Sequence, residues 1–298
     1  MTVPPGSCEL RLGGQVFPPG RLLVMAIINR TPDSFYPAAR QLADDVAADA
    51  VAAAVAGGAD LVDVGGVKAG PGQDVDEAEE LQRVVPFIER TRAAFPGLLI
   101  SVDTWRAEVA RQACLAGADL VNDTWAGHDP GLPEVAAELG AGLVCSHTGG
   151  AVPRTRPHRV SYGNHPEGVV DDVLAVLRAA ADRAVAAGVD PASVLVDPTH
   201  DFGKNTWHGL ALLRRTEDLV QLGHPVLMAL SRKDFVGETL DLPVEERLEG
   251  TLAATAVAAW SGAKVFRTHD VRATRRVLDM VASIRGDRPP ATAVRGLA

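Results

Sequence analysis

Residues 98–123 read LLISVDTWRAEVARQACLAGADLVND and contain the repeating unit that decides the fold. The apolar run Leu98–Val102 is short and continuous, as expected of a strand covered on both faces. Polar Asp103 follows it, and the apolar spacing over Arg106–Ala116 is that of a helix. A second apolar run, Leu120–Asn122, comes next. A strand, a helix and another strand in this order indicate a βαβ unit with parallel strands.

The same alternation runs through most of the 298 residues and predicts eight strands. Open doubly wound sheets more often stop at about five or six strands, so we expect a (β/α)8 TIM barrel of the α/β class. The single domain should span residues 21–285, between an N-terminal lead-in over 1–20 and a C-terminal tail over 286–298. The expected strands are Leu22–Ile28, Leu61–Val64, Leu98–Val102, Leu120–Asn122, Gly142–Cys145, Val194–Asp197, Val226–Leu230 and Val265–Arg267. The helical stretches include Leu42–Ala56, Asp76–Ala94, Arg106–Ala116, Val169–Ala187 and Glu245–Trp260.

A short phrase containing glycine recurs where a helix hands over to a strand. Glycine can take the left-handed conformation that ends a helix, so the phrase predicts turns between helices and strands rather than a ligand site. Its copies are Ala56-Gly-Gly-Ala-Asp-Leu61, Ala116-Gly-Ala-Asp-Leu120, Ala187-Gly-Val-Asp190 and Ser261-Gly-Ala-Lys-Val265.

The charge balance excludes several classes of protein. The chain has 29 basic and 38 acidic residues, a net charge of −9 and no basic run, so we expect neither a nucleic-acid partner nor an anionic membrane surface. No cationic leader and no apolar stretch of about 18 residues is present, and we expect a soluble, cytoplasmic protein. Its three cysteines lack the spacing of a disulfide framework or a zinc site.

Polar residues close all eight predicted strands, at the end of a barrel where active sites lie. Asp103, Asn122 and Asp197 can bind a planar heterocycle edge-on through carboxylate and amide groups. Cations gather at the last two strands, where barrels often bind phosphate. They are Lys233, Arg267 and His269. A heterocycle joined to an anionic group is the ligand that this pattern indicates. No motif for a nucleophile with its base is present.

Several phrases resemble the dihydropteroate synthase family and occur in the family's order between about residue 22 and residue 285. The resemblance implies a barrel that joins p-aminobenzoate to 6-hydroxymethyl-7,8-dihydropterin diphosphate with release of pyrophosphate, usually as a homodimer. The phrases are Met25-Ala-Ile-Ile-Asn-Arg-Thr-Pro-Asp-Ser-Phe35, Asp63-Val-Gly-Gly66, Ser101-Val-Asp-Thr104, Asn122-Asp123, Asp197-Pro198, Phe202-Gly-Lys204, Ser231-Arg-Lys233 and Arg267-Thr-His-Asp-Val271.

The resemblance also assigns expected roles to single residues. The residues form three sets, which are expected to bind the pterin, the diphosphate and the p-aminobenzoate. The resemblance also implies a Mg2+ ion, with Asn29 as its contact. The pterin set is Asp103, Asn122, Asp197 and Lys233; the diphosphate set is Asn29, Arg267 and His269; the p-aminobenzoate side is Phe202, Ser231 and Arg232. No residue is assigned as a proton-transfer catalyst, because the reaction depends on stabilising the leaving group and excluding water.

The chain departs from the family pattern in its loops. The family has Glu-Ser-Thr-Arg-Pro-Gly where this chain has Val67-Lys-Ala-Gly-Pro-Gly72, so a threonine and an arginine are missing. A glycine-containing polar stretch is replaced by Tyr36-Pro-Ala-Ala-Arg40, and a glycine-rich turn by Thr199-His-Asp201. Asp201 should place a carboxylate near an anionic ligand, and Ser146 stands where the family has methionine against the pterin ring.

These departures favour a dihydropteroate synthase-like paralogue with little or no synthase activity that keeps a pocket for a pterin or an aromatic amine. Loss of one charged contact to the leaving group typically costs about 3 kcal/mol, or roughly a hundredfold in rate. Two alternatives stay open. The chain is an active, divergent synthase in which Lys68 or Arg40 replaces the missing arginine, or it binds an anionic heterocycle without turning it over.

Overall fold

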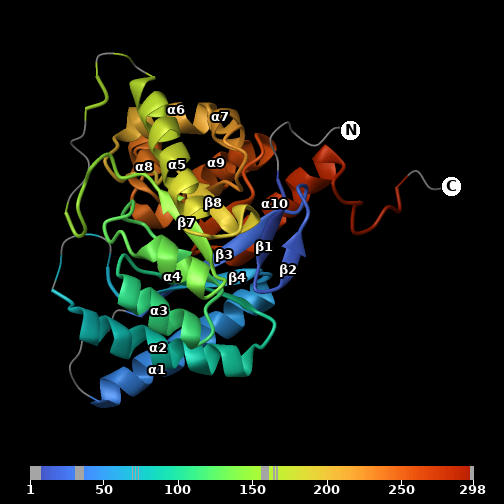
Figure 1. Cartoon of the computed structure of the whole chain (residues 1–298). Coiled ribbons are helices and arrows are strands. Elements are labelled where there is room, and N and C mark those ends of the chain that lie inside the picture. Colours follow the sequence, from blue (N-terminus) through green and yellow to red (C-terminus); the bar gives the residue numbers. More distant parts are fainter. Residues whose placement is uncertain are drawn as a thin grey trace.

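A nearly closed eight-stranded parallel barrel forms the centre of the molecule, in a computed structural model (Figure 1). The model describes residues 8–30, 37–68, 70, 72, 74–155, 161–163, 165 and 167–295. The strand order is β8-β7-β6-β5-β4-β3-β10-β9. A parallel bridge between Val196 and Val226 joins the two outer strands, and the Val196 N–H donates to the Pro225 carbonyl at 3.0 Å. These contacts close the sheet and confirm the predicted TIM barrel.

The strands agree with the predicted runs to within one residue at each end. They are β3 (Leu23–Asn29), β4 (Leu61–Gly65), β5 (Leu99–Asp103), β6 (Leu120–Asn122), β7 (Gly142–Ser146), β8 (Val194–Asp197), β9 (Leu227–Ala229) and β10 (Val265–Thr268). The helices surround them and are α1 (Pro37–Gly57), α2 (Glu77–Ala94), α3 (Ala107–Leu115), α4 (Leu132–Glu138), α5 (Gly168–Ala186), α6 (Thr206–Arg214), α7 (Thr216–Val220), α8 (Asp234–Leu240), α9 (Leu248–Trp260) and α10 (Val271–Arg285).

Two of the predicted helices begin more than one residue away from the expected start. Helix α1 begins at Pro37 rather than Leu42, and proline is well tolerated in the first turn of a helix because it needs no N–H donor there. The predicted helix from Glu245 instead begins with a separate 3-10 turn, η2 (Val244–Glu246), and α9 follows from Leu248. Another 3-10 turn, η1 (Pro191–Ser193), precedes β8.

The recurring glycine phrase adopts the predicted turn at all four positions. Each glycine has a positive φ angle, between 93° and 115°, which side chains with a Cβ rarely adopt. The backbone reverses there from the end of a helix to the start of the next strand. These glycines are Gly58, Gly117, Gly188 and Gly262.

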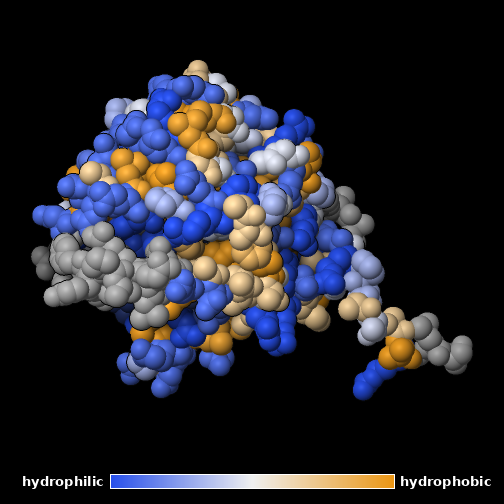
Figure 2. Space-filling model, turned by 90° about the horizontal axis from the view of Figure 1, so that it is seen from below, coloured by the Kyte–Doolittle hydropathy of each residue, from blue (hydrophilic) through white to orange (hydrophobic). Residues whose placement is uncertain are grey.

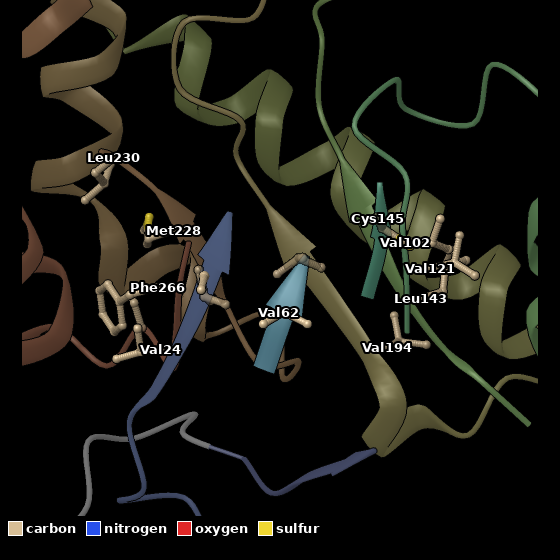
Figure 3. Close-up of a cluster of buried hydrophobic side chains, with 14 of the residues drawn as sticks. Val24, Val62, Val102, Val121, Leu143, Cys145, Val194, Met228, Leu230 and Phe266 are labelled. Atoms are coloured by element: carbon tan, nitrogen blue, oxygen red, sulfur yellow. The ribbon is translucent and has the colours of Figure 1, made fainter. Parts of the chain in front are cut away.

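Two apolar layers hold the barrel together, because alternate residues of each strand face opposite sides of the sheet. The outer layer packs between strands and helices, and Figure 3 shows part of it. It includes Val24, Val62, Val102, Val121, Leu143, Val194, Met228 and Phe266. The inner layer fills the barrel and includes Leu23, Met25, Leu61, Leu99, Leu120, Val144, Leu195, Leu227 and Val265.

A two-stranded antiparallel hairpin packs into the inner layer from the N-terminal side. It consists of β1 (Leu10–Leu12) and β2 (Gln15–Phe17), which lie within the expected lead-in. Leu10 and Leu12 are buried with the inner apolar residues. A Cβ on Gly142 would come within 2.4 Å of the Leu12 side chain, so the hairpin can approach only because this strand begins with glycine.

The surface seen in Figure 2 is mostly hydrophilic, with apolar atoms gathered in smaller patches between polar ones. The chain after α10 extends away from the barrel (Figure 1). Within the described ranges, every helix is too short or too polar to cross a membrane. Cys8, Cys114 and Cys145 are all free thiols.

Candidate functional site

A cavity of about 360 Å3 opens at the C-terminal ends of the barrel strands. Its position follows from the parallel topology, which brings the polar residue after every strand to the same end. Its lining combines charged side chains with apolar ones. The residues are Ile27, Asn29, Gly65, Val67, Lys68, Asp103, Thr124, Asp197, Thr199, Phe202, Ala229, Lys233, Arg267 and His269.

Arg267 lies between two carboxylates at the base of this cavity. Its Nε donates to Asp63 Oδ2 at 2.6 Å and its Nη2 donates to Asp103 Oδ2 at 2.9 Å. Burial raises the pKa of Asp103 to about 7; Arg267 opposes this rise, and the neighbouring Asp63 adds to it. The Thr124 hydroxyl donates to the other oxygen of Asp103 at 3.1 Å. The single positive charge of the guanidinium is therefore shared by two carboxylates, although other N–H donors of Arg267 remain.

Asp197 ends β8 and presents a carboxylate to the cavity. It is 2% exposed, and its Oδ1 accepts the Thr199 N–H at 2.7 Å. Among the described residues, no donor pairs with its Oδ2. Burial raises the pKa of Asp197, and the ammonium of Lys233 opposes that rise. Lys233 donates to the His200 carbonyl and lies 5.6 Å from the centre of the Phe202 ring.

The three residues expected on the p-aminobenzoate side do not all line the cavity. Phe202 lines the cavity, whereas Ser231 lies behind it, with its Oγ 3.1 Å from His269 Nδ1. Arg232 has φ 54° and turns toward Asp270, with two N–H···O contacts of 2.9 and 3.0 Å. It also donates to the carbonyls of Val244 and Glu245 and does not line the cavity.

Asn122 sits below the cavity rather than in its lining. Its Nδ2 donates to Asp63 Oδ2 at 3.0 Å, while its Oδ1 is buried without a hydrogen-bond partner in the described structure. An unpaired buried acceptor is costly, so a donor from a ligand that reached this depth would be stabilised. Ser101 donates to the second oxygen of Asp63 at 2.6 Å.

The described residues do not form a magnesium site by themselves. Mg2+ favours carboxylate and phosphate oxygens in octahedral geometry. Asn29 offers one neutral amide at the cavity rim, and Asp63 and Asp103 are occupied by Arg267. No group of three or more histidine, cysteine or carboxylate side chains able to hold a metal was found in the described part of the chain.

A buried lysine joins the loops that follow β7 and β8. Lys204 Nζ lies 2.8 Å from His147 Nδ1 and donates to the carbonyls of His147 and Phe202 at 2.9 and 2.8 Å. His147 Nε2 lies 2.7 Å from Asp172 Oδ2 on α5. A carboxylate accepts hydrogen bonds, so the contact with Asp172 favours a proton on Nε2 and leaves Nδ1 as an acceptor for Lys204. Burial and Lys204 lower the pKa of His147 to about 4, and burial lowers that of Lys204 to about 7.

The altered loops have different structural consequences. Lys68 is exposed and lines the cavity, while a Cβ on Gly70 would meet no described heavy atom within 4 Å. The run Tyr36-Pro-Ala-Ala-Arg40 lies outside the described side chains. Asp201 does not line the cavity as expected, because its Oδ2 accepts the Asp234 N–H at the start of α8.

Comparison with known proteins gives the family. A family model described as "Pterin binding enzyme" matches residues 25–269, which is most of the barrel. The chain belongs to the pterin-binding enzyme family. This match agrees with the resemblance found in the sequence.

Relatives within the family divide into two kinds. The chain is 68% identical to a Mycobacterium leprae protein named inactive dihydropteroate synthase 2, over 93% of this chain and 96% of the relative. It is 40% identical to a Bacillus subtilis dihydropteroate synthase, over 88% of each chain. A solved Xanthomonas albilineans dihydropteroate synthase with 4-aminobenzoic acid has a TM-score of 0.82 and 36% identity, covering 94% of this chain and 98% of that chain.

Most of the expected site residues meet at the cavity. Asn122, Ser231 and Arg232 lie outside its lining. Two residues with a structural part at the site, Asp63 and Lys204, had no role assigned from the sequence. The signal was present, because both occur in the phrases that carry the family resemblance.

The lowered pKa of Lys204 predicts a pH-dependent contribution to stability. Between pH 7 and about 10 the unfolded chain holds the proton that the folded chain releases, so stability rises with pH by up to about 1.4 kcal/mol per unit. Lys204→Met lacks this gain, and its stability deficit relative to the wild type should grow between pH 7 and pH 9. Denaturant unfolding at both pH values measures this, with Lys68→Met at an exposed lysine as the charge control. A deficit that is the same at both pH values contradicts the prediction.

Proposed function

We propose that this protein binds a pterin in the barrel cavity and has little or no dihydropteroate synthase activity. The observation that carries the proposal is the buried carboxylate of Asp197, which faces the cavity with one oxygen unpaired among the described residues. A carboxylate in this position can accept two parallel N–H bonds from an aminopyrimidine edge. Asn122 Oδ1, buried without a donor, supplies a further acceptor below it.

The charges of the residues expected near the leaving group support the proposal that turnover is impaired. Arg267 is held by Asp63 and Asp103, and Gly70 has no side chain where the family has arginine. Transition-state charge on a departing diphosphate would therefore meet little compensating charge. The name of the Mycobacterium leprae relative, an inactive dihydropteroate synthase 2, agrees with this proposal. Any Mg2+ would have to be bound largely by the oxygens of a diphosphate.

Pterin binding should depend on the charge of Asp197. Asp197→Asn keeps the shape but loses one acceptor oxygen, and hydrogen bonds to charged groups contribute about 1.5–3 kcal/mol, so affinity should fall roughly tenfold or more. Calorimetric titration with 6-hydroxymethyl-7,8-dihydropterin measures this. Asp201→Asn is the matched control, because that carboxylate lies in the same turn and caps α8 instead of lining the cavity. Equal affinities of wild type and Asp197→Asn would refute the assignment.

Synthase activity should be at least about a hundredfold below that of a family member with the complete loop. The double substitution Ala69→Thr with Gly70→Arg should raise the rate of dihydropteroate formation, since it restores the threonine and the cation. Steady-state assays at saturating substrate test both statements. Normal turnover by the wild type would instead support a divergent synthase, and loss of that turnover in Lys68→Ala would identify Lys68 as the replacement cation.

We further propose a homodimer through the outer faces of α9 and α10. The support is a set of apolar side chains, each at least half exposed, on two adjacent helices. Exposed apolar side chains that gather on one part of a surface often mark an interface. The residues are Val257, Trp260, Met280 and Ile284.

Trp260→Glu should convert the dimer to a monomer, because it places a charge in the middle of an apolar contact. Sedimentation velocity at micromolar concentrations measures the change. Trp207→Glu is the control, since Trp207 is 77% exposed on α6 and is not part of the proposed interface. A monomeric wild type, or a dimer unaffected by Trp260→Glu, contradicts this interface.

A further inference from the structure

The cations around the cavity differ in how far their charge is available to a ligand. Arg267 is the most deeply placed, and two carboxylates share its single charge at 2.6 and 2.9 Å. An anion that approaches the guanidinium also approaches Asp63 and Asp103. Because like charges repel strongly in a poorly hydrated site, this cluster offers little net attraction to a phosphate.

His269 does not make up for the deficit. Burial and the nearby Arg267 lower the pKa of its imidazole, so the ring is neutral at physiological pH. Its Nδ1 is already within 3.1 Å of Ser231 Oγ. The ring can form one further hydrogen bond through Nε2, but it brings no full charge.

Lys233 and Arg232 already have hydrogen-bond partners in the structure. Lys233 donates to the His200 carbonyl and lies in the field of Asp197 and Asp201. Arg232 is bound by Asp270 at the start of α10 and by two loop carbonyls. Arg232 does not line the cavity, whereas Lys233 does.

Among the cations of the described lining, Lys233 and Lys68 form no ion pair with another described residue. Lys233 donates to the His200 carbonyl, whereas Lys68 forms no hydrogen bond in the described structure. It is exposed at the rim, where solvent screens its charge. An exposed ion pair of this kind typically changes an equilibrium by no more than about fivefold. The cavity as a whole is therefore close to electrically neutral, because the positive charges of its lining are matched by carboxylates. The cations are Lys68, Lys233 and Arg267, and the carboxylates are Asp103, Asp197 and the Asp63 side chain that binds Arg267. Asp197 and the unpaired Asn122 oxygen remain as acceptors for a heterocycle.

We propose that the cavity binds pterins with an uncharged 6-substituent about as well as their diphosphate esters, so that a diphosphate on this substituent raises affinity by less than about tenfold. The inference rests on the proposed function and specifies the ligand class of the same site. On this inference the residues of the cavity fit the pterin alcohol at least about as well as they fit its diphosphate ester. A protein of this kind holds a pterin without selecting the activated form.

Two titrations with the full chain test the preference. Calorimetry compares 6-hydroxymethyl-7,8-dihydropterin with its diphosphate, each with and without Mg2+. The expected result is dissociation constants within tenfold of each other in both buffers. A diphosphate that binds more than tenfold tighter in either buffer overturns the inference but leaves the proposed pterin site standing. If neither compound binds, the proposed function fails and the inference fails with it.

Variants at Gly70 separate charge from loop shape. The space around Gly70 has no described atom within 4 Å of an added Cβ, so side chains can be introduced there. Gly70→Arg should raise the preference for the diphosphate by about tenfold or more over that of the matched neutral variant Gly70→Gln, since a hydrogen bond to a charged group typically contributes this much. Equal preferences in the two variants would overturn the inference, because a missing cation would then not explain the weak binding of the diphosphate.

Discussion

Arg267 brings a positive charge into the barrel just above its apolar interior, where little water reaches it, and the carboxylates of Asp63 and Asp103 stabilise that charge. The three side chains come from β10, β4 and β5, so their pairing connects the last strand of the chain with two early ones. Ser101 and Asn122 complete the hydrogen bonds of Asp63. The upper layer of the barrel is thus a connected polar network in place of a continued apolar core.

This network has different consequences for the recognition of a heterocycle and for the stabilisation of a leaving anion. Arg267 balances two carboxylates, whereas Asp197 is left with an unpaired oxygen in the same cavity. Recognition of a heterocycle needs the second of these groups, whereas stabilisation of a leaving anion needs free positive charge. A chain can therefore keep a pterin-shaped cavity while the leaving-group side becomes neutral.

The barrel below the network does not depend on the altered loops. Its inner apolar layer is completed by Leu10 and Leu12 of the N-terminal hairpin, which reach their places because Gly142 has no side chain. Lys204 and His147 hold the loops after β7 and β8 from behind the cavity. Loops at the C-terminal face of a barrel can change while such contacts keep the scaffold stable. This accounts for an intact fold beside changed residues at the expected reaction centre.

The sequence alone determined the local structure and the end of the barrel at which a cavity forms. Apolar periodicity and the recurring glycines depend on neighbouring residues, so the strands were predictable to one residue and the left-handed turns at Gly58 and Gly117 were expected. Only the tertiary structure decided which polar groups pair. Arg267 and Asp63 are 204 positions apart, and other carboxylates at the strand ends could have paired with Arg267 instead. Closure of the barrel selects among them, because the strength of a buried ion pair depends on distances that no local pattern encodes. For the same reason the orientation of Arg232 toward Asp270 was not foreseeable.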